Sequence, residues 1–172
     1  MRPSTTEGRG PRLLGIYLND HLAGATGGLE LARRVARSTP VPDDARVLRR
    51  LAAEIAADRQ ALLEMMAALG VPARSYKRYA AWIGEKAGRL KLNGHLLTRS
   101  PLSSLEELEL LRLGVEGKAA GWRTLRTLAD RDRRLHSGRL DELISAARRQ
   151  AGLLEDLRIQ AADQVIAADQ TR

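Results

Sequence analysis

Three ionisable side chains in this sequence lie on helical faces that are otherwise apolar: His21, Glu54 and Asp58. The stretch 43–69 predicts one long amphipathic helix, since its apolar residues recur every three or four positions. The resulting stripe consists of Leu51, Ile55, Leu62, Met66 and Leu69. Asp58 falls on this stripe, and Glu54 lies one turn before it. The spacing therefore predicts two carboxylates in or beside a buried helix face.

His21 is predicted to lie opposite Asp58. The segment 11–37 has apolar residues at helical spacing, and His21 falls in the middle of its inward face. The short, proline-containing connection before Asp43 predicts an antiparallel helical hairpin. Counted from Val41, His21 is 20 residues back and Asp58 is 17 residues forward, so both side chains are expected at about the same height.

This arrangement has three interpretations that the sequence leaves open. Imidazole and carboxylate ligands suit iron, manganese or zinc, so His21, Glu54 and Asp58 form a candidate metal site. Glu109, near the apolar stripe of segment 101–132, is a fourth candidate ligand. Alternatively, His21 and Asp58 form a structural pair, because a buried ionisable group needs a partner. In the third interpretation the register differs, and one of the two groups is solvated.

The rest of the sequence offers no recognised catalytic motif. Dinuclear metal sites in helical bundles use Glu-x-x-His, which is absent, and His95 and His136 fall in expected loops. The segment 114–118 contains glycines and a lysine without the phosphate-loop pattern. There is no Cys, which excludes disulfide and thiolate chemistry. We therefore favour a protein without enzymatic activity and expect no cofactor, with iron or manganese as the alternative.

A second candidate site is the basic segment 74–99, which has seven Lys or Arg residues and one acid. Tyr76, Tyr79 and Trp82 lie among them, as on surfaces that stack single-stranded nucleic acid. The candidate polyanion-binding residues are Arg74, Lys77, Arg78, Lys86, Arg89 and Lys91. Alternatively, the aromatic residues belong to the core and the basic residues form a solvated face. The net charge of +8 likewise suits either an acidic partner or a codon bias towards arginine.

Composition predicts an all-α protein. Leu and Ala together number 55, Val and Ile only 12, and Phe is absent, a balance that favours helices over strands. Helices are expected at 11–37, 43–69, 73–92, 101–132 and 138–168. The glycines of the first indicate either a bend or the close approach of another helix, and those of the fourth leave open a kink or two shorter helices. They form one domain, 11–168, between a disordered tail at 1–10 and a frayed end at 169–172. No apolar run reaches the roughly 18 residues that span a bilayer, so we expect a soluble, cytoplasmic protein without membrane contact.

These elements predict an antiparallel four- to five-helix bundle, and their order resembles the ferritin-like helical bundles. The resemblance lies in two helical hairpins, a crossing linker, His21, and the run E54-I-A-A-D58. It implies the fold, while the missing Glu-x-x-His departs from the metal-binding members. The stretches LGIYLNDHLAGATGG, KLNGHLLTRSPLSSLEELELL and LGVEGKAAGW also resemble a small bacterial family of unassigned function.

The leading interpretation is a non-enzymatic helical bundle that acts through binding or assembly. The first alternative is a ferritin-like metal-binding protein, and the second is a polyanion or nucleic-acid binder. We also expect a homodimer, since Leu- and Ala-rich helices often leave apolar surface and symmetric dimers are the commonest oligomers. A different protein partner is a further alternative.

Overall fold

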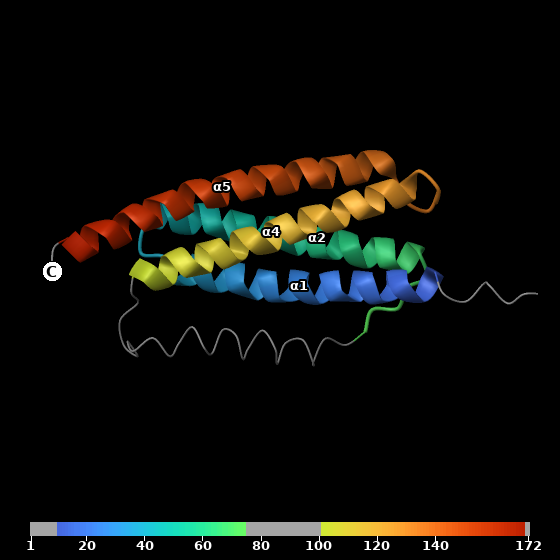
Figure 1. The fold of residues 1–172 in the computed structure, drawn as a ribbon, viewed down its shortest axis with the longest axis horizontal. Coiled ribbons are helices and arrows are strands. Elements are labelled where there is room, and N and C mark those ends of the chain that lie inside the picture. The colour runs from blue at the N-terminus through green and yellow to red at the C-terminus, as the bar shows by residue number, and fades with distance from the viewer. Residues whose placement is uncertain (1–9, 75–100, 171–172) are drawn as a thin grey trace, which may run out of the picture.

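The structure is a computed structural model that describes residues 10–74 and 101–170. These residues form four helices and no strand: α1 (Gly10–Ser38), α2 (Pro42–Ala68), α4 (Pro101–Ala129) and α5 (Ser137–Gln170) (Figure 1). The all-α prediction is therefore confirmed for the described ranges. Of the helix expected at 73–92, only Ala73 and Arg74 are described, and they are not helical. None of the described helices has a stretch apolar enough to span a membrane.

Local sequence signals explain where α2 begins and ends. Pro42 opens the helix, and Asp43 and Asp44 in its first turn face the positive end of the helix dipole. At the other end Gly70 has a φ of +71°, which glycine adopts without steric cost. Two backbone hydrogen bonds close this cap, Gly70 N to Ala67 O at 3.0 Å and Val71 N to Met66 O at 2.8 Å. The end of this helix, predicted at residue 69, is confirmed to within one residue.

Both glycine-rich helices are continuous. α1 passes through its glycines at 24–28, and α4 passes through those at 114–121, without an interruption in the helix. The alternative of two shorter helices at 101–132 is therefore wrong. The cost of each glycine, about 1 kcal/mol relative to alanine, is spread over helices of 29 residues that bury apolar side chains along much of their length.

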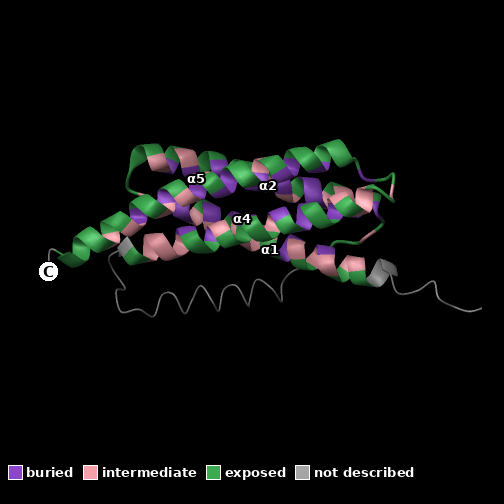
Figure 2. Cartoon of the chain, turned by 45° about the horizontal axis from the view of Figure 1, so that its top comes forward, coloured by how far each residue is buried: buried purple, intermediate pink, exposed green. Residues whose placement is uncertain are grey.

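The helices pack side by side as a bundle around one apolar core (Figure 2). α1 packs mainly on α2 and α4 mainly on α5, while α1 also contacts α4 and α2 contacts α5. The largest fully buried side chains are Leu18, Val35, Leu48, Leu51, Met66, Leu111, Leu125, Leu140 and Leu154. Burial of each of these side chains stabilises the fold by roughly 1.5–3 kcal/mol. The core therefore offsets the cost of burying the few polar groups that it encloses.

Candidate functional site

The most buried polar residues in the described chain are Asp58 of α2 and Gln150 of α5, which are 6% and 3% exposed. They meet Lys118 of α4, whose side chain is 12% exposed. Lys118 Nζ lies 2.5 Å from Asp58 Oδ2 and also donates to Gln150 Oε1. Gln150 Nε2 in turn lies 3.2 Å from Asp58 Oδ2. We call these three residues the polar cluster.

The polar cluster is balanced in charge and connected to the surface. One ammonium and one carboxylate neutralise each other, which is the condition for keeping either group in the interior. Gln150 Nε2 also lies 3.2 Å from Glu54 Oε2, and Glu54 reaches the exposed Arg50 at 3.6 Å. The cluster thus ties three helices together at one level of the bundle and fixes the position of the Lys118 ammonium.

The predicted burial of Asp58 is confirmed, but its predicted partner is wrong. Asp58 pairs with Lys118 and Gln150, and no hydrogen bond joins it to His21, although both residues are in the described part of the chain. His21 instead lies against α4. A Cβ added to Gly121 would be 3.0 Å from both Cε1 and Nδ1 of the His21 ring. The imidazole therefore occupies the space that the glycine leaves open.

Tyr17 holds the His21 ring from a second side. The two rings meet edge-on, with centroids 4.5 Å apart and an interplanar angle of 67°. Tyr17 OH is within 3.0 Å of Thr124 Oγ1, which links the same turn of α1 to α4. Tyr17 and Gly121 together direct His21 towards α4 rather than α2.

His21 and Lys118 meet at a cavity of about 200 Å³ between α1 and α4. Its walls also include Leu18, Leu62, Trp122 and Leu125, so most of its surface is apolar. The rim is open at glycines: a Cβ at position 24, 114 or 117 would meet nothing within 4 Å. Apolar cavities with a few convergent polar groups are the usual form of small-molecule sites.

Burial lowers the pKa of His21 below its usual range, and the nearby Asp20 carboxylate partly opposes this shift. The imidazole is therefore neutral at pH 7, with one nitrogen donating and the other accepting a hydrogen bond. Lys118 has three N–H donors, of which Asp58 and Gln150 take two. The described residues that line the cavity thus carry three kinds of unused polar group: the third donor of Lys118, the two nitrogens of His21, and the N–H of Trp122, which is buried without a hydrogen-bond partner.

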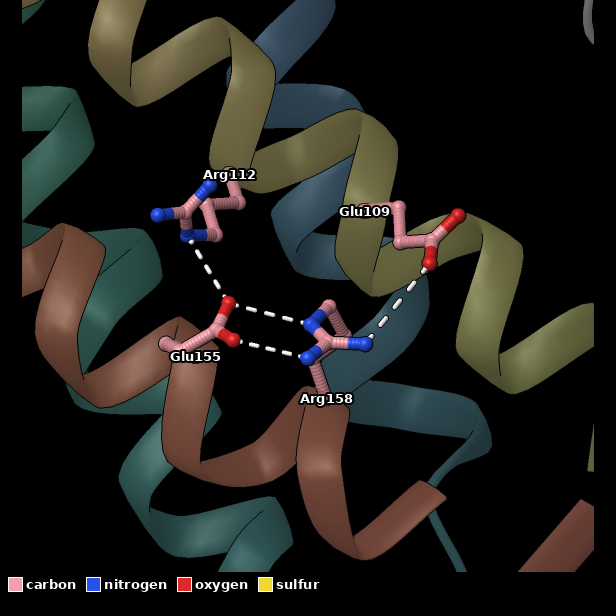
Figure 3. A network of polar contacts seen from close by, with 4 residues as sticks. All are labelled: Glu109, Arg112, Glu155 and Arg158. Atoms are coloured by element: carbon pink, nitrogen blue, oxygen red, sulfur yellow. Dashed lines mark hydrogen bonds and ion pairs between the residues drawn. The ribbon is translucent and has the colours of Figure 1, made fainter. Parts of the chain in front are cut away.

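Glu109 takes part in a different arrangement, on the surface between α4 and α5 (Figure 3). Arg158 lies 3.9 Å from Glu109 and 2.7 Å from Glu155, and Arg112 lies 3.0 Å from Glu155. The hydrogen bond from Arg158 is the main reason that the pKa of Glu155 is lowered. Glu109 is therefore an ion-pair partner between helices and is not brought to His21, Glu54 or Asp58.

The described ranges contain no group of three or more histidine or acidic side chains placed to hold a metal ion. Glu54 and Asp58 do come together, but on the amide of Gln150. Of the candidate polyanion-binding residues, Arg74 alone is described, and it is exposed. Lys77, Arg78, Lys86, Arg89 and Lys91 lie outside the described residues.

Helical spacing alone places Gln150 on the apolar stripe of α5, and Lys118 falls in the glycine-containing segment 114–118. The residue type of Gln150 was the signal that it has a functional or structural partner, because an amide within an apolar stripe requires a hydrogen-bond partner on a facing helix. Lys118 gave a comparable signal, since it lies three residues after Val115 and four before Trp122, both on the apolar stripe of α4. Comparisons with family models, curated proteins and solved structures found no match to this chain. The cavity and the polar cluster are therefore interpreted from their own chemistry.

Proposed function

We propose that this protein is a non-enzymatic binding protein whose ligand occupies the α1–α4 cavity. The observation that carries the proposal is that His21 and Lys118, from different helices, line the same small apolar space. The polar cluster holds Lys118 in place before a ligand arrives, and Tyr17 and Gly121 do the same for His21. Pre-positioned polar groups lower the entropy lost on binding.

The size and charge of the cavity define the class of ligand. An apolar cavity of about 150 Å³ binds benzene, so one of about 200 Å³ suits a single ring with a small substituent. Asp58 already neutralises Lys118, and His21 is neutral, so an uncharged ligand fits better than an anion. A ring hydroxyl is complementary to both polar groups, because it accepts from Lys118 and donates to the free nitrogen of His21.

The direction and order of the helices in the bundle are also part of what we propose. We infer an antiparallel arrangement of two helical hairpins, α1–α2 and α4–α5, as in a ferritin-like bundle. The short connections at 39–41 and 130–136 support it, since connections of this length join neighbouring helix ends. The iron or manganese alternative and the homodimer stay predictions.

Phenol is expected to bind the wild-type protein with one site per chain in isothermal titration calorimetry. Toluene has a similar shape but no hydroxyl. It should bind roughly 3- to 10-fold more weakly, because it cannot form the one or two modest hydrogen bonds of phenol. Benzoate should bind most weakly, because its charge has no counterion in the cavity. The variant His21→Leu replaces the imidazole with an apolar side chain of similar size and should weaken phenol binding part of the way to the level of toluene, because the hydrogen bond from Lys118 remains.

The matched control is His136→Leu, a change at an exposed histidine that lies outside the cavity. It should bind phenol as the wild type does. Equal binding of phenol and toluene, or equal losses in the two histidine variants, would exclude a role for His21 in this cavity.

A further inference from the structure

A larger groove lies at the end of the bundle where α1 begins and where α2 and α4 end, the right-hand end in Figure 1. Its volume is about 1080 Å³, at the upper limit for ligand sites. Leu14, Leu69, Val71 and Leu128 line it with apolar side chains. This groove is distinct from the α1–α4 cavity, because the two share none of the lining residues that the structure describes.

The side of the groove along residues 71–74 is held by hydrogen bonds to α1. Asn19 Oδ1 accepts a hydrogen bond of 2.7 Å from the backbone N–H of Arg74. Asn19 Nδ2 donates to Pro72 O at 3.2 Å. These contacts place Arg74 at the groove although it lies beyond the end of α2.

The described charged residues that line the groove are of one sign. They are Arg74, Arg131 and Arg134, and none of the described lining residues is acidic. Arg134 is already engaged: Asp132 accepts from it at 2.9 and 2.6 Å, and Leu69 O accepts from it at 3.4 Å. Its guanidinium holds the pKa of Asp132 at about 2, so the pair stays ionised. Arg74 and Arg131 are exposed and form no ion pair with any residue that the structure describes.

We propose that this groove binds an amphipathic carboxylate, with its alkyl chain along the four apolar residues and its carboxylate at Arg74 and Arg131. Guanidinium groups match a carboxylate in shape and charge, and the apolar lining accounts for a chain. Single-stranded nucleic acid fits less well, because none of the lining residues that the structure describes is aromatic and could stack on a base. The proposed site thus relies on positive charge, as the polyanion hypothesis does, but its ligand is an amphipathic carboxylate.

Decanoate is the probe, titrated into the full chain by calorimetry. We expect saturable binding with one site per chain, and at least about tenfold weaker binding by the double variant Arg74→Gln/Arg131→Gln, since hydrogen bonds to charged groups are the stronger class. Decanol, which lacks the charge, should bind the wild type about as weakly as decanoate binds the double variant. The matched control Arg133→Gln, at an exposed arginine that does not line the groove, should leave decanoate binding unchanged.

Three results would overturn the proposal. The first is equal affinity for decanol and decanoate, which would mean an apolar surface without a head-group site. The second is an equal loss in Arg133→Gln, which would mean general surface charge. The third is the absence of saturable heat from decanoate, whether a single-stranded oligonucleotide binds instead or other residues of the chain fill the groove. Phenol binding is measured separately in each variant, so failure here and failure of the α1–α4 cavity site are distinguishable.

Discussion

Replacing Lys118 by methionine is expected to lower the free energy of unfolding by about 3–5 kcal/mol. Methionine matches the length of the lysine stem but leaves the Asp58 carboxylate, only 6% exposed, without its counterion. Gln150 Oε1 loses its donor at the same time. The measurement is urea unfolding followed by circular dichroism at 222 nm, a helix signal, at a fixed pH.

The comparison variant is Arg139→Met, which removes an exposed ion pair on α5. Arg139 and Glu142 are 3.1 Å apart, with side chains 57% and 69% exposed. Breaking this pair should change the free energy of unfolding by no more than about 1 kcal/mol. The double variant Lys118→Met/Asp58→Leu should be more stable than Lys118→Met alone, because it removes the stranded charge. Strictly additive effects of the two changes would mean that Lys118 and Asp58 are not coupled.

Gly121→Val is expected to lower the free energy of unfolding by about 1–3 kcal/mol, a usual cost of overpacking. A Cβ alone would approach the His21 ring to 3.0 Å, and two further methyl groups enlarge the conflict. The ring is also held edge-on by Tyr17, so moving it away means giving up that contact. Thermal and urea unfolding of the variant measure the loss.

Gly152→Val on α5 is the matched control for this prediction. Gly152 is exposed, and an added Cβ there meets nothing within 4 Å. Valine has a higher helix propensity than glycine, so this change should stabilise the protein by a few tenths of a kcal/mol. If Gly121→Val is as stable as Gly152→Val, His21 does not lie against Gly121.

The sequence predicted the four described helices well because each carries its own local signals. Pro42 and Gly70 begin and end α2 at positions that depend on backbone chemistry alone. The position of Asp58 on an apolar stripe likewise required only helical spacing, and its burial followed. Predictions of this kind depend only on residues that lie within about one helical turn of each other.

The partner of Asp58 was not predictable by the same means. Counting residues from Val41 estimates the height of His21 along the bundle, but it does not give the rotation of α1 about its own axis. Successive side chains are about 100° apart around a helix. A modest rotation of α1 about its axis therefore turns the His21 side chain away from α2 and towards α4. That rotation depends on the fit of an imidazole into the space at Gly121, more than 90 residues away. Lys118 then takes the place that was assigned to His21.

The proposed ligand site in the α1–α4 cavity is tested most directly by the glycine amide signals of a ¹⁵N-labelled sample during a phenol titration. Gly117 and Gly121 line the cavity, whereas Gly70 lines the larger groove and Gly152 lies on α5 outside both. We expect saturable shifts at Gly117 and Gly121, together with the His21 ring nitrogens, and constant signals from Gly70 and Gly152. Saturable shifts at Gly70 instead, or shifts that never saturate at any glycine, would contradict binding in the α1–α4 cavity.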